Sequence, residues 1–158
     1  MSNTQYAFLM RNRVPNREAL QSSIDALGFD LKLDPTFTPF EDSGFSPCVL
    51  NGSGDIGFEV LYQPAAEVDG LERVAGANDY CISMTWHGSM KDCASAMIVS
   101  CALAKDFGAI ITYEGEEPDP FDKLLGETKK IMNDAQKEPV KSQVPSNEIA
   151  RRPWWKLW

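Results

Sequence analysis

The sequence predicts an α+β domain in which helices pack on one face of a mostly antiparallel sheet. Residues 80–86 alternate apolar and polar side chains, which is the period of a strand with one buried face. Residues 90–107 are apolar around most of a helix that begins after Ser89, a capping residue, and ends before Gly108. Two strand-like runs flank a Gly-rich turn at residues 51–54, which indicates a hairpin.

The N-terminal part of the chain supplies the first three elements. Residues 6–10 form an apolar run that predicts a strand. Pro15 fits the first turn of a helix, where its missing amide costs nothing, and Gly28 ends the apolar stripe that follows. Residues 29–33 alternate again and stop before Pro35, so we expect a second strand there.

The middle of the chain alternates irregular segments with short strands. Residues 36–46 mix Phe, Pro, Gly and acids without a period and predict a loop. The arms of the hairpin are residues 47–50 and 58–62, and a polar loop is expected at residues 64–78. After the apolar helix, residues 109–113 predict a short buried strand.

A last helix is predicted to follow, with Asp119 as its cap, Pro120 at its first position and Asp122 in its first turn. The element order is then β-α-β-β-β-β-α-β-α. This order fits a sheet with helices on one face, close to the split βαβ or ferredoxin-like arrangement. It excludes a doubly wound Rossmann sheet, because hairpins join the strands between the first two helices.

Charge and composition divide the chain into three parts. Residues 1–136 are predicted to form a single α+β domain, and they carry 10 Lys and Arg against 21 Asp and Glu, a net charge of −11. Residues 137–150 form a polar linker, and residues 151–158 form a Trp-rich C-terminal tail. The acidic domain should repel nucleic acid and anionic membranes, so we expect neither as a partner, and it suits a basic protein.

Other global features indicate a cytoplasmic protein. No apolar run approaches the roughly 20 residues of a membrane span, and residues 1–13 lack the charge order of a signal peptide. The four cysteines show no C-x-x-C spacing and are expected to be reduced core residues. Short strands with an exposed edge could pair between subunits, so the sequence is compatible with an oligomer.

Two features that resemble catalytic or cofactor motifs lack the required context. Residues 52–57 match G-x-G-x-x-G, but a strand follows where a dinucleotide site needs a helix, so we interpret the match as a hairpin turn. His87 is the single histidine, and a structural role is favoured over catalysis. The alternative hypothesis is a small enzyme with His87 as acid or base, supported by Glu59 or Glu114. No cofactor, metal ligand or catalytic residue is predicted.

An acidic cluster follows the last predicted strand. It places five carboxylates in nine residues with no basic residue among them: Glu114, Glu116, Glu117, Asp119 and Asp122. The dipole of the last helix explains Asp119 and Asp122 but not the other three. The calcium-loop pattern D-x-D-x-D-G is absent, so we interpret the cluster as a docking surface for a basic protein partner.

The tail holds three of the four tryptophans, Trp154, Trp155 and Trp158. Tryptophans beside Arg151 and Arg152 are typical of a docking motif. Three sites could receive this segment: the domain itself, a groove on a partner, or a membrane interface. An adaptor that docks through the tail is therefore a further hypothesis.

The Ala-rich helix and the segment that follows it at residues 107–116 resemble small acidic bacterial immunity proteins of toxin systems. The resemblance covers residues 5–135 and rests on pattern, so no functional residue follows from it. It implies a non-enzymatic inhibitor whose basic partner is a toxin. We therefore expect a cytoplasmic binding protein that presents its acidic cluster, together with the tryptophans of the tail, to that partner.

Overall fold

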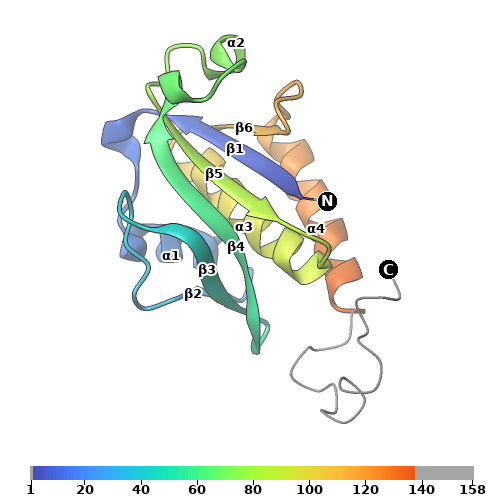
Figure 1. Cartoon of the computed structure of the whole chain (residues 1–158). Coiled ribbons are helices and arrows are strands. Elements are labelled where there is room, and N and C mark those ends of the chain that lie inside the picture. The colour runs from blue at the N-terminus through green and yellow to red at the C-terminus, as the bar shows by residue number, and fades with distance from the viewer. Residues whose placement is uncertain (1, 138–158) are drawn as a thin grey trace, which may run out of the picture.

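A computed structural model describes residues 2–137 as one six-stranded antiparallel sheet with helices packed against it (Figure 1). The strand order is β2-β3-β4-β5-β1-β6. The strands are β1 (Asn3–Leu9), β2 (Leu31–Leu33), β3 (Ser43–Leu50), β4 (Ser53–Pro64), β5 (Tyr80–Trp86) and β6 (Ile110–Tyr113). The α-helices are α1 (Arg17–Ala26), α2 (Glu72–Ala75), α3 (Met90–Asp106) and α4 (Phe121–Ala135), with single 3₁₀ turns η1 (Arg11–Arg13) and η2 (Ala65–Glu67).

The predicted α+β class is confirmed, and the split βαβ arrangement is present. β5 and β6 are joined by α3 and lie on either side of β1, which is antiparallel to both. β2 to β5 form a meander of hairpin-linked strands. The predicted order of long elements is also confirmed. The short helix α2 and the turn η2 occupy the segment that was expected to be a loop.

Strand alternation decides which face of the sheet the helices cover. Ala7 and Leu9 of β1 lie beside Ile82 and Tyr80 of β5, and all four belong to the main core under α1, α3 and α4. Figure 1 shows these three helices on one side of the sheet. Burying such apolar side chains against helices contributes about 1.5–3 kcal/mol per large residue.

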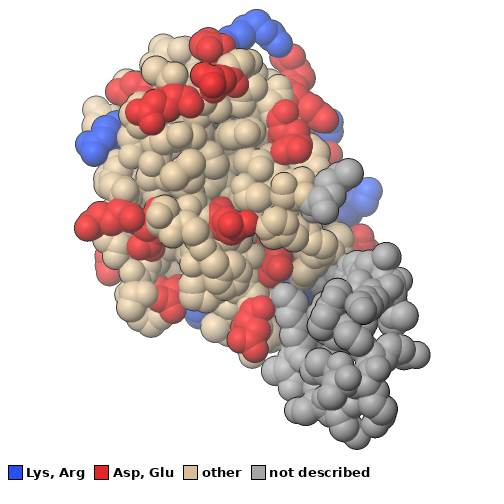
Figure 2. Space-filling model, viewed as in Figure 1, with Lys and Arg blue, Asp and Glu red and all other residues tan. Residues whose placement is uncertain are grey.

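The opposite face of the sheet is only partly covered. At one end, Phe8 and Cys81 form a small second core with Ala65 of η2, Ala75 of α2 and Val68, which follows η2. The expectation that β5 buries a single face was therefore wrong, because Cys81 and Ser83 are buried as well. Figure 2 looks onto this face and shows acidic side chains spread over it, with Lys and Arg at its margins.

Several predicted boundaries need correction. β3 begins at Ser43, inside the segment expected to be irregular, because residues 43–46 pair with residues 58–61 of β4. Pro15 precedes α1, and Asn16 is the cap instead: its side-chain oxygen accepts a hydrogen bond from the Ala19 amide at 2.7 Å. Asp119 is not the cap of α4 either, since Pro120 occupies that position.

The cap of α3 and the hairpin turn agree with the sequence analysis. The Ser89 hydroxyl accepts hydrogen bonds from the amides of Lys91 and Asp92 at 3.2 and 3.3 Å. The G-x-G-x-x-G match lies in the turn between β3 and β4 and at the start of β4. Its last glycine, Gly57, is required by close packing, because a Cβ there would lie 2.1 Å from the carbonyl oxygen of Ser46.

Candidate functional site

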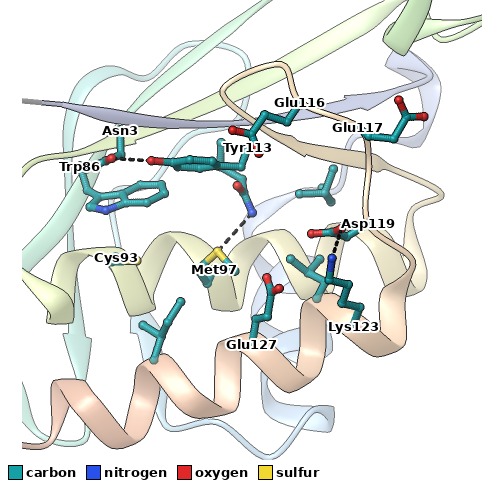
Figure 3. Close-up of a pocket in the computed structure, with 14 residues that line it drawn as sticks. Asn3, Trp86, Cys93, Met97, Tyr113, Glu116, Glu117, Asp119, Lys123 and Glu127 are labelled. Atoms are coloured by element: carbon teal, nitrogen blue, oxygen red, sulfur yellow. Dashed lines mark hydrogen bonds and ion pairs between the residues drawn. The ribbon is translucent and has the colours of Figure 1, made fainter.

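A groove with a volume of about 580 Å³ lies at one edge of the helix-covered face (Figure 3). β6 and the turn after it form one wall, α4 forms the other, and α3 contributes Met97 to the floor. The volume lies within the range of small-ligand and side-chain binding sites. Part of the floor is apolar, with Ile111, Leu124 and Ile131 among its residues.

The ends of three neighbouring strands bring polar and aromatic side chains to this groove. Asn3 of β1 lies beside Trp86 of β5, and Gln5 of β1 lies beside Tyr113 of β6. The Tyr113 hydroxyl donates a hydrogen bond to the side-chain oxygen of Asn3 at 2.6 Å. The rings of Trp86 and Tyr113 are tilted, with centroids 6.1 Å apart. Two aromatic rings therefore lie side by side in the lining of the groove.

A tight turn after β6 carries the acidic cluster. Glu114 has a positive φ of 54°, and the amide of Glu116 donates a hydrogen bond to the Tyr113 carbonyl at 2.9 Å. Glu114 is used within the fold, because its carboxylate accepts a hydrogen bond from the Thr4 amide at 2.8 Å. Gly115 packs so closely that a Cβ would lie 2.6 Å from a methyl carbon of Leu71. This closely packed turn presents the residues that follow to the groove.

Four carboxylates line the groove against a single cation, Lys123. We call them the rim carboxylates: Glu116, Glu117, Asp119 and Glu127. Asp119 forms an ion pair with Lys123 at 3.1 Å, which leaves three of the four negative charges without a compensating charge in the lining.

The remaining rim carboxylates are weakly compensated within residues 2–137. Glu117 lies 3.7 Å from Arg73, but both side chains are more than 80% exposed (81% and 84%), so this pair contributes little. Glu116 and Glu127 have no ion-pair partner among the described residues. The negative field raises the pKa of Lys123, first through its hydrogen bond to Asp119 and then through the charges of Asp119 and Glu127.

One buried polar group in the groove lacks a hydrogen-bond partner. Gln5 is only 2% exposed, and its amide nitrogen donates to the sulfur of Met97 at 3.2 Å. Its side-chain oxygen has no partner among the residues that the structure describes. A buried acceptor of this kind costs about 1–3 kcal/mol when it stays unsatisfied. The groove therefore combines an unpaired acceptor at depth with carboxylates at its rim.

The structure brings together only part of the predicted site. Glu116, Glu117 and Asp119 line the groove, whereas Glu114 is held by β1. Asp122 is exposed on α4 and is not in the lining. The predicted linker beyond Lys137 and the tryptophans of the tail lie outside the described residues.

Several groove residues were missed in the sequence analysis, among them Gln5, Trp86 and Glu127. Two of them carry a readable signal. Gln5 is a polar residue at an inward position of an alternating strand, and Glu127 follows Asp119 and Lys123 at the four-residue spacing of one helix face.

His87 lies away from this groove on the uncovered side of the sheet. Its Nε2 atom is 2.8 Å from a carboxylate oxygen of Glu59, and 64% of its side chain is exposed. Of the two supporting carboxylates named in the enzyme hypothesis, Glu59 is the one in contact, while Glu114 bonds to β1. His87 lines neither the groove nor the hollow that Glu59 lines on the uncovered side of the sheet.

Within residues 2–137, no cluster of His, Cys, Asp and Glu has the arrangement of a metal site. No helix in that part of the chain has the length and apolar character needed to cross a membrane. All four cysteines are buried thiols, and burial raises the pKa of Cys48 to about 12 and of Cys81 to about 11. Such thiols are poor nucleophiles.

Comparisons with protein-family models, with curated proteins and with solved structures gave no match.

Proposed function

We propose that the protein is a non-enzymatic binding protein, an inhibitor of the immunity type, that recognises a basic protein partner with the rim carboxylates of its groove. The observation that carries this proposal is the excess of carboxylates around a concave site: four line it against Lys123 alone.

The charge of the whole domain supports the same role. Residues 1–136 carry a net charge of −11, so the domain attracts a basic partner from a distance. The rim carboxylates then supply local contacts for lysine and arginine side chains. Because the groove is concave, a projecting side chain of the partner can be held there away from bulk solvent, where ionic contacts are stronger than on an open surface.

The test is a calorimetric titration of the full chain with the purified product of the adjacent gene. We expect an association that weakens as salt rises from about 50 to 300 mM, because the charges become screened. The absence of a complex, or a complex with no dependence on salt, would contradict the proposal.

A matched pair of variants locates the interaction. In the rim variant, Glu116→Gln, Glu117→Gln and Glu127→Gln remove three charges from the groove and keep the Asp119–Lys123 pair. In the control variant, Glu41→Gln, Asp55→Asn and Asp134→Asn remove three exposed charges that do not line the groove. The rim variant should lose about tenfold or more in affinity, and the control should change by less than about threefold. Equal losses would show that only net charge matters.

A further inference from the structure

We infer that the groove between β6 and α4 is an arginine-binding site: it takes one arginine side chain from the partner, with the guanidinium group between Gln5 and the rim carboxylates. This inference deepens the proposed function, because the claim that the arginine belongs to a basic protein partner rests on that function. The chemistry of the site follows from the groove alone.

The unpaired oxygen of Gln5 determines one property of the ligand. This atom is a hydrogen-bond acceptor, is buried, and belongs to a side chain that lines the groove. A ligand that restores its hydrogen bond must bring a donor. One of the two N–H groups of the same amide donates to Met97, whereas the oxygen accepts no hydrogen bond among residues 2–137. The deep end of the groove therefore selects for an N–H or O–H group.

The negative charge of the groove determines a second property of the ligand. Glu116 and Glu127 line the same groove without an ion-pair partner among residues 2–137, and burial together with Glu114 and Glu116 raises the pKa of the Tyr113 hydroxyl. The two carboxylates favour a cationic ligand, and the raised pKa of Tyr113 reflects in part the same negative charge. A neutral donor would satisfy Gln5 but would leave the carboxylates uncompensated. The ligand is therefore a cation with several donors.

The chemistry of the groove favours an arginine side chain over a lysine side chain. A guanidinium group has five donors in a plane, so it can bond to the Gln5 oxygen and a carboxylate at the same time. It also stacks on aromatic rings, and Trp86 and Tyr113 offer two rings in this lining. An ammonium group is more strongly hydrated and would give up more solvation in the groove. The apolar side chains of Ile111, Leu124 and Ile131 suit the aliphatic part of the arginine side chain.

The test uses the full chain and three blocked tripeptides that carry arginine, citrulline or lysine between two alanines. Citrulline keeps the shape of arginine and removes its charge. Followed by NMR, the arginine peptide should bind saturably with a Kd of about 1 mM and shift the Gln5 side-chain amide and the Trp86 indole signals. The citrulline and lysine peptides should bind about tenfold and about threefold more weakly. Equal affinities of the three peptides, or no saturation by roughly 10 mM, would overturn the assignment and leave water as the occupant of the groove.

Two variants keep the test independent of folding. Gln5→Leu removes the acceptor and should lower the affinity of the arginine peptide about threefold or more. Glu127→Gln changes a half-buried residue on the surface of α4 and should lower arginine affinity about threefold even if Gln5→Leu fails to fold. If Glu127→Gln leaves arginine affinity unchanged, the carboxylate is not a ligand and the site is wrong.

The outcome separates the two proposals. If the arginine peptide binds but the basic partner does not associate with the chain, the arginine site stands and the proposed function fails. If the partner binds in a salt-dependent way and the peptide does not, the proposed function stands and the arginine site fails.

Discussion

Helix α3 is packed on both of its long sides, but the two sides differ in how completely they are closed. On the α1 side, Leu20 and Ile24 are fully buried, and the buried Ser23 hydroxyl donates to the Ala102 carbonyl at 3.4 Å and also contacts Asp106. On the α4 side, a groove opens between α4 and β6 beside α3, and Gln5 keeps an oxygen with no partner within residues 2–137.

From this difference between the two sides of α3, we infer where an external ligand binds. A domain that satisfies a buried hydroxyl on one side of a helix has the means to satisfy polar groups within its own chain. Where it leaves an acceptor unpaired beside uncompensated carboxylates, we propose that the missing donor and charge come from an external ligand. The closed side is accordingly the scaffold, and we propose the groove side as the binding surface.

The largest expected effect compares core truncations on the two sides. Ile24→Ala on the closed side should lower the free energy of unfolding by about 2–5 kcal/mol, because it leaves a cavity. Ile131→Ala in the floor of the groove should cost less than about half as much, since that side chain is only half-buried. Urea denaturation of both variants measures the difference. Equal losses would show that the α4 side is as closed as the α1 side.

The second prediction compares the two buried polar groups. Gln5→Leu should raise the free energy of unfolding by about 1–3 kcal/mol, because it removes an unsatisfied acceptor. Ser23→Ala should lower it by about 1 kcal/mol, because it removes a hydroxyl that has its hydrogen bonds. Thermal or urea unfolding measures both. A destabilised Gln5→Leu variant would mean that the Gln5 oxygen has a partner in the folded chain.

The third prediction concerns alkaline pH. Burial raises the pKa of Cys48 from 9.0 to about 12 and that of Cys81 from 9.0 to about 11, so the folded state keeps both protons after the unfolded state has lost them. Stability is then fully present below pH 9 and falls as the pH rises toward 11, by about 1.4 kcal/mol per pH unit for each thiol. Urea denaturation at several pH values should show a shallower slope in Cys48→Ala. An unchanged slope in that variant would contradict the account.

The smallest expected effect is on the stability of the rim variant. Removing charges from Glu116, Glu117 and Glu127 should change the free energy of unfolding by at most about 0.5 kcal/mol, because these carboxylates hold no element in place. The loss of partner binding would then be a property of the surface. A large destabilisation would instead assign the rim carboxylates a structural role, as Glu114 already has.

Much of the scaffold could be predicted from the sequence, because each element has a local signature. The cap at Ser89, the stop at Gly108 and the alternation of residues 80–86 are all read from neighbouring residues. The cover on the second face could not be found in this way, since the segment of η2 and α2 has no periodicity. Its contacts with Phe8 and Cys81 depend on the tertiary fold.

The groove could be predicted only in its acidic half. The residues after β6 form a dense acidic run, so they are visible in the sequence. Gln5, Trp86 and Glu127 come from three other elements, and only the strand order β5-β1-β6 and the packing of α4 bring them together. Because these residues are far apart in the chain, no local sequence pattern reveals that they lie close together.

The most direct test of the central claim is the ratio of affinities of the intact chain for the arginine and citrulline peptides. The two peptides differ only in the charge and the hydrogen-bond donors of one side chain. The ratio of their affinities therefore reports on the chemistry of the groove and not on its size. We predict a ratio of about ten in the wild-type chain, reduced about threefold in Glu127→Gln. A ratio of one in the wild-type chain would contradict the account.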